Sequence, residues 1–138
     1  MMAWLNATPK PDAGTKRAKA EGNAPKLSRM DQMKRDKIVP QMPPNPAPHI
    51  IDRLVEIGLT EAAGMGAAPL SWQSILAWQD AVSVALPPWE ARLIRKLSVE
   101  YLAESRRAES ENCPAPWRGE VTQREVETEV DRLRMLLG

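Results

Sequence analysis

The sequence predicts an all-α protein, because its composition is unfavourable for a sheet and rich in helix-forming residues. Aromatic residues make up only 4% of the 138 residues, phenylalanine is absent, and five of the aromatic side chains are tryptophans. Sheets favour aromatic and β-branched residues, so a sandwich or barrel is not expected. Alanine, leucine, arginine and glutamate dominate instead, and these residues favour helices. The length corresponds to one domain.

Charge and proline divide the chain into three predicted parts. Residues 1–48 contain nine Lys or Arg and four Asp or Glu, whereas residues 49–138 contain ten and fourteen. We expect an extended, basic, proline-rich arm over 1–48, a body of three helices over 49–110, and a proline hinge with an amphipathic helix over 111–138. The dispersed lysines of the arm favour contact with water or a protein partner over contact with nucleic acid.

The arm contains three features of interest. Trp4 stands among polar residues and marks a docking point on the body or on a partner, or else an exposed, unstructured end. Residues 1–26 are otherwise predicted to be irregular, because prolines and glycines interrupt them. Ser28 and Asp31 have capping-box spacing, which predicts a short helix over 29–37. Five prolines between residues 40 and 48 predict a stiff polyproline II linker or a strap along the body.

The body begins with a helix over 48–57, since Pro48 suits a first helical turn and Gly58 suits a stop. Residues 59–69 read as a flexible loop of small residues. Ser71 is a good N-cap for a second helix that ends before Leu86, and a third helix is predicted over 88–109. Apolar residues in these helices recur at steps of three and four, which predicts a buried stripe. The side chains expected to be mostly buried are Trp72, Trp78, Trp89, Leu93, Leu97 and Tyr101.

The last helix, over 122–137, has the clearest start signal. Thr122 and Glu125 form a capping box, and apolar residues then recur at steps of four, three and four. The helix packs either on its own body or on a partner, and we predict a partner-binding or self-association element. Trp117 in the preceding hinge is a further candidate, with a lid over the body as the alternative. The candidate partner-binding residues are Trp4, Trp117, Val126, Val130, Leu133 and Leu137.

The sequence contains no recognisable catalytic or metal-binding constellation. His49 is the single histidine and Cys113 the single cysteine, so they cannot form a zinc site or a disulfide within one chain. Gly64 and Gly66 lack the context of a phosphate-binding loop. We therefore expect no enzyme and no cofactor. No signal-peptide core or membrane-spanning run is recognised, and a cytoplasmic protein is expected.

Four stretches of the sequence carry a resemblance to a known group. They are residues 51–58 (IDRLVEIG), 69–79 (PLSWQSILAWQ), 86–98 (LPPWEARLIRKLS) and 101–105 (YLAES). Together with the start at Trp4 and the proline strap, they resemble small proteins of tailed bacteriophages and prophages described as tail assembly chaperones, encoded near the tape measure protein. The resemblance covers about half of the chain well, and it does not extend to the last helix.

This resemblance implies a non-enzymatic role in the host cytoplasm. Such chaperones bind the tape measure protein or the tail tube protein, and association between copies of the chain is left open. A membrane and nucleic acid are not among the expected partners. The alternative is a structural tail or connector protein that stays in the virion and uses its N-terminal arm to strap neighbouring subunits. A small DNA-associated phage protein that uses the basic arm is a third class.

Overall fold

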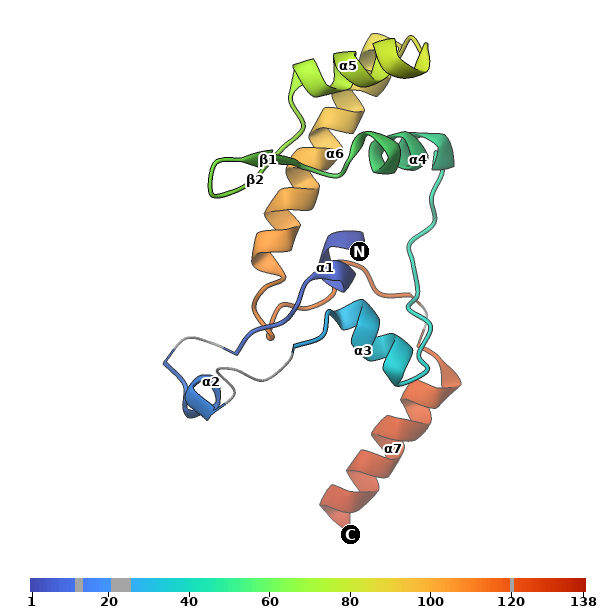
Figure 1. The fold of residues 1–138 in the computed structure, drawn as a ribbon. Helices are drawn as coiled ribbons and strands as arrows, with labels where there is room; N and C mark the ends of the chain where they lie inside the picture. Colours follow the sequence, from blue (N-terminus) through green and yellow to red (C-terminus); the bar gives the residue numbers. More distant parts are fainter. Residues whose placement is uncertain (12–13, 21–25, 120) are drawn as a thin grey trace.

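The computed structural model describes residues 1–11, 14–20, 26–119 and 121–138, and in these it is mostly helical with one short hairpin (Figure 1). The expectation of irregular chain at 12–13 and 21–25 falls outside the described residues. The elements are α1 (Met2–Asn6), α2 (Lys16–Ala20), α3 (Arg29–Arg35), α4 (Pro48–Ile57), β1 (Glu61–Ala63), β2 (Gly66–Ala68), α5 (Trp72–Val82), α6 (Pro88–Arg107) and α7 (Gln123–Leu137). None of the described helices is both long and apolar enough to span a lipid bilayer.

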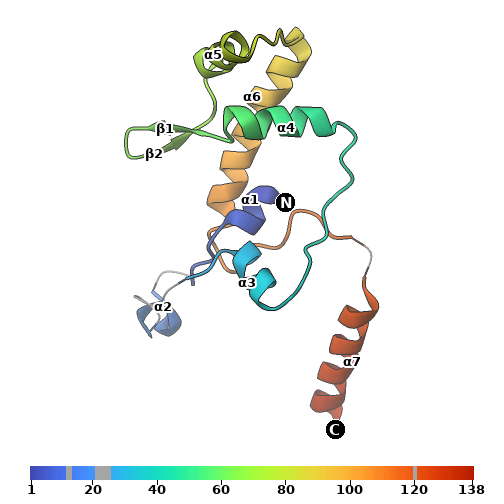
Figure 2. The same ribbon diagram turned by 45° about the vertical axis from the view of Figure 1, so that its right-hand side comes forward.

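Helix α6 is the axis on which the other elements pack. Helices α4 and α5 lie against its N-terminal part, and α1 lies near its C-terminal end (Figures 1 and 2). Ile50 and Leu54 from α4 meet Leu70, Ile75 and Ile94 in one buried cluster. Helices α4, α5 and α6 are present where helices were predicted, with the predicted start at Pro48 and the predicted N-cap at Ser71.

The buried face of α6 differs from the predicted stripe. Its buried residues are Glu90, Ile94, Ser98 and Leu102, whereas Leu93, Leu97 and Tyr101 are only partly buried. Trp78 is also partly buried, but Trp72 and Trp89 are 50% and 56% exposed, so their predicted burial was wrong. A small residue lets other segments approach α6 closely. The fully buried Ser98 hydroxyl donates to the Leu59 carbonyl at 2.7 Å and accepts from the Leu70 N–H at 2.9 Å.

The predicted loop over 59–69 contains an antiparallel hairpin instead, so the fold is not strictly all-α. Strand β1 pairs with β2 from Glu61 opposite Ala68 to Ala63 opposite Gly66. Gly64 has a φ of +53° at the first position of the two-residue turn, where glycine is favoured. The hairpin is tied to α5 because the Glu61 carboxylate accepts hydrogen bonds from Ser71 and Ser74 at its N-terminus.

The N-terminal segment packs on the body and is not an extended arm. Leu5 of α1 is fully buried, and the backbone of Lys10 bonds to Glu109 and Glu111 in a short parallel bridge. Helix α3 follows Ser28, whose side chain accepts from the Asp31 N–H as the capping pattern predicts, and it ends at Arg35. The proline strap between α3 and α4 has no helix or strand, and it returns the chain to α4 (Figure 2).

Candidate interaction surfaces

A clamp at the end of α6 fixes the N-terminal segment. Arg29 is 9% exposed, and its guanidinium donates to the carbonyls of Trp4 at 3.1 Å, Ala108 at 2.6 Å and Ser110 at 2.8 Å. It also lies 4.6 Å from the centre of the Trp4 ring. A cation is stabilised at a helix C-terminus, where carbonyls lack partners. Burial lowers the pKa of Arg29 from its ordinary value, and the guanidinium stays charged.

The clamp accounts for the position of Trp4. The Trp4 indole N–H donates to the Cys113 carbonyl at 2.9 Å, and the ring stacks with Arg29. The sequence allowed Trp4 to dock on the body, to dock on a partner or to be exposed, and in the structure it packs on its own chain. The indole N–H contacts the segment that follows α6, and the ring contacts Arg29, which binds carbonyls at the end of α6.

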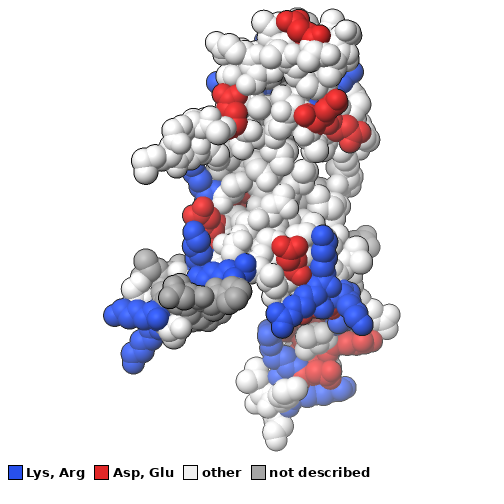
Figure 3. Space-filling view, in the orientation of Figure 1, with Lys and Arg blue, Asp and Glu red and all other residues white. Residues whose placement is uncertain are grey.

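An apolar groove of about 470 Å³ lies on the described surface. We call it the methionine groove, and it lies between α1, the proline strap, α4 and α6. Among its lining residues are Met1, Met2, Met42, Ile51, Leu97 and Tyr101. Figure 3 shows a largely uncharged surface over the middle of the molecule, with Lys and Arg gathered below it. The lining of the groove is mostly apolar, and its charged members are Glu100, Glu104 and Arg107 on α6.

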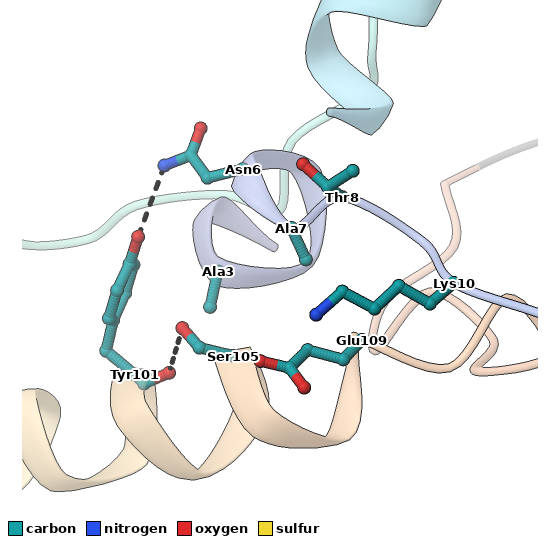
Figure 4. A pocket seen from close by; sticks show the side chains of 8 residues that line it. All are labelled: Ala3, Asn6, Ala7, Thr8, Lys10, Tyr101, Ser105 and Glu109. Atoms are coloured by element: carbon teal, nitrogen blue, oxygen red, sulfur yellow. Dashed lines mark hydrogen bonds between the residues drawn. The ribbon is translucent and has the colours of Figure 1, made fainter. Parts of the chain in front are cut away.

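A second, smaller hollow of about 280 Å³ lies on the other side of α1 (Figure 4). Asn6 donates to the Tyr101 hydroxyl at 3.3 Å across its mouth, and the Ser105 hydroxyl donates to the Tyr101 carbonyl. Lys10 and Glu109 complete its polar wall. Its alanines and short polar side chains offer little apolar area, so we assign no ligand to it.

Helix α7 is exposed over its whole length. Its capping box is present, because the Thr122 hydroxyl accepts from the Glu125 N–H while the Glu125 carboxylate accepts from the Thr122 N–H. No residue of α7 is buried, and the helix stands clear of the body in both ribbon views (Figures 1 and 2). The exposed fractions of its predicted partner-binding side chains are 49% for Val126, 38% for Val130, 48% for Leu133 and 86% for Leu137.

Trp117 lies in the segment that joins α6 to α7. It is half-buried, and its Cη2 is 2.9 Å from the position that a Cβ on Gly119 would take. The same Cβ would be 2.0 Å from the Gln41 side chain, so Gly119 lies against the proline strap. The structure thus separates the six predicted binding residues into two packed tryptophans and one exposed helix, and it does not bring them into a single site.

His49 and Cys113, the two residues that the sequence analysis examined as possible zinc ligands, lie among contacts that hold the fold together. His49 lies 3.4 Å from the buried Glu90 carboxylate, which also pairs with Arg53, and these contacts join α4 to α6. Cys113 is a free, partly buried cysteine beside the clamp. Among the described residues, no three His, Cys, Asp or Glu side chains are grouped so that they could hold a metal ion.

The chain matches no protein-family model, no curated protein and no solved structure. Its surfaces therefore have to be interpreted from their own geometry. The methionine groove was not found by sequence reasoning, because its walls come from segments that are distant in the sequence, from Met1 to Pro116. The feature of the sequence that could have pointed to the groove is the set of methionines at positions 1, 2 and 42.

Proposed function

We propose that the protein is a non-enzymatic tail assembly chaperone, which binds apolar helical segments of a phage tape measure protein before the tail tube encloses them. The observation that carries this proposal is the methionine groove. The resemblance of residues 51–105 to tail assembly chaperones supplies the identity of the client. The protein would act in the cytoplasm of the host cell, where tails are built.

The chemistry of the groove suits a client with many different apolar faces. Methionine is unbranched and polarisable, so methionine-rich surfaces adapt to partners of different shape. An amphipathic helix binds such a groove by placing its apolar face on the floor and its polar face toward water. A tape measure protein is long and helical, and its apolar faces aggregate unless another surface covers them.

Charged groups at the groove favour one orientation of a bound helix. Glu100, Glu104 and Arg107 line the groove on α6, and Arg107 pairs with Glu104 at 3.1 Å. Glu100 is left as an exposed acidic group on the same helix. A client helix with lysine or arginine beside its apolar face would gain complementary charge there, which improves specificity and the rate of association.

The experiment is capture of the tape measure protein encoded by the same genome, with two matched variants. Met42→Glu places a charge in the groove at a half-exposed position, and we expect capture to fall at least tenfold. Met65→Glu makes the same change at the fully exposed tip of the hairpin, outside the groove, and it should leave capture unchanged. Equal capture by both variants would remove the groove from the proposal.

A second measurement separates a chaperone from a structural tail or connector protein. Mass spectrometry of purified particles should find at most traces of a chaperone, whereas a strapping subunit should be present in fixed copy number. The contacts of α1 and Arg29 with the chain's own α6 favour the chaperone, because they occupy much of the segment that strapping would use. Stoichiometric amounts in the particle would establish the structural role instead.

A further inference from the structure

The apolar residues of α7 follow the spacing of a coiled coil. Val126, Val130, Leu133 and Leu137 are separated by four, three and four residues, which is a repeat of 3.5. This places Val130 and Leu137 at position a of a heptad and Val126 and Leu133 at position d. All four side chains are exposed in the single chain. A helix of this length is marginal in water by itself, so the seam calls for a partner.

The charges that flank the seam identify that partner. In this heptad register Glu129 occupies position g and Arg134 occupies position e. In a parallel, in-register pair, a residue at g lies opposite the residue at e five positions later in the other helix. Glu129 of one copy therefore faces Arg134 of the second copy, and the two-fold symmetry makes this contact twice.

The existing contacts of these two side chains do not compete strongly with the pairing. Arg132 approaches Glu129 at 3.6 Å and Arg134 approaches Asp131 at 3.5 Å within the helix. These side chains are more than 60% exposed, and exposed pairs of this kind contribute little to stability. They can be exchanged for contacts across the seam at small cost.

We propose that α7 pairs with α7 of a second copy along this seam. In an antiparallel pair, Glu127 of one copy would face Arg134 of the other, so the charges that flank the seam complement a second copy in either orientation. The dimer joins two bodies through the segment 114–119, and it does not depend on the function proposed above.

Sedimentation of the full chain over a range of concentrations tests the pairing. The wild-type protein should dimerise, and Arg134→Glu should raise the dissociation constant about tenfold, since two exposed ion pairs become repulsive contacts. Arg124→Glu makes the same charge change at position b, away from the seam, and should have no effect. In the Arg134→Glu background, a second change should restore the wild-type dissociation constant: Glu129→Arg if the pair is parallel, and Glu127→Arg if it is antiparallel.

Disulfide trapping gives an independent readout of the register. In a Cys113→Ser background, Val130→Cys places a thiol at position a, which faces itself in a parallel, in-register pair. Oxidised glutathione should link this variant into dimers if the pair is parallel, whereas Thr128→Cys at the outward position f should stay without a disulfide link in either orientation. A wild-type chain that is monomeric at all concentrations overturns the proposal. Failure of both Glu129→Arg and Glu127→Arg to rescue Arg134→Glu also overturns it.

Discussion

The guanidinium of Arg29 lies 4.6 Å from the centre of the Trp4 ring and donates a hydrogen bond to the Trp4 carbonyl. One arginine thereby joins α1 and α3 to the end of α6, because it also donates to Ala108 and Ser110. The position of α1 depends on this contact, and α1 forms one wall of the methionine groove. The clamp therefore supports one wall of the methionine groove as well as the fold.

Replacing Arg29 with methionine should destabilise the protein by about 2–4 kcal/mol, because three carbonyls at the end of α6 lose a charged donor. Urea denaturation measures this loss. Arg29→Lys should recover only part of it, since an ammonium group cannot reproduce the planar fork and the stacking on Trp4. Arg35→Met on the exposed end of α3 is the control and should change the free energy of unfolding by less than about 0.5 kcal/mol.

The clamp also shows what sequence reasoning could not provide. Helix starts were predictable at Ser28, Ser71 and Thr122, because a cap depends on residues three positions apart. The docking of α1 was not predictable, since it depends on a contact between Arg29 and carbonyls 79 and 81 residues away. Local patterns specify elements, while the placement of Arg29 depends on the finished fold.

The predicted burial of Trp89 on α6 was wrong for a related reason. Large apolar residues such as Trp89 mark a helix face, but α6 is approached from several sides and its closest contact uses Ser98. A serine gives no hydrophobic signal, so the burial of Ser98 could not be predicted from the apolar periodicity. The hairpin over 61–68 was missed because its alanines and glycines have little strand propensity.

Ser98 should be sensitive to substitution although it is small. Ser98→Val leaves the Leu59 carbonyl and the Leu70 N–H without their buried partner, and we expect a loss of about 1–3 kcal/mol in the free energy of unfolding. Ser105→Ala is a matched control on the same helix, because its hydroxyl bonds only to a carbonyl of its own helix. Equal losses for both variants would contradict this role of Ser98.

The hairpin anchor predicts a dependence of stability on pH. Hydrogen bonds from Ser74 and Ser71 lower the pKa of Glu61 below its ordinary value of 4.5. The anchor therefore stabilises the fold fully above the pKa of the unfolded chain and is lost as the pH falls through the lower pKa of the folded state.

The urea midpoint of Glu61→Gln should consequently fall less between pH 7 and acid pH than that of the wild type. Ser74→Ala removes the largest cause of the shift and should change the pH dependence in the same direction. A Glu61→Gln variant with the full acid sensitivity of the wild type would show that the carboxylate does not anchor the hairpin.

Removal of residues 121–138 tests whether α7 belongs to the body. No residue of α7 is buried, so the remaining chain should unfold cooperatively with a free energy changed by less than about 0.5 kcal/mol, as for other exposed changes. The denaturation should be measured at a protein concentration below the dissociation constant of the dimer, because dimer formation stabilises the folded state by mass action.

The double variant Val130→Asp with Leu133→Asp makes the same test without shortening the chain. It removes the centre of the apolar seam but leaves the capping box at Thr122 and Glu125 intact. We expect association to be lost while the melting temperature at low concentration stays close to that of the wild type. Unfolding or aggregation of the body after either change would mean that α7 packs on its own core in solution. Its exposed seam would then serve the chain itself rather than a second copy.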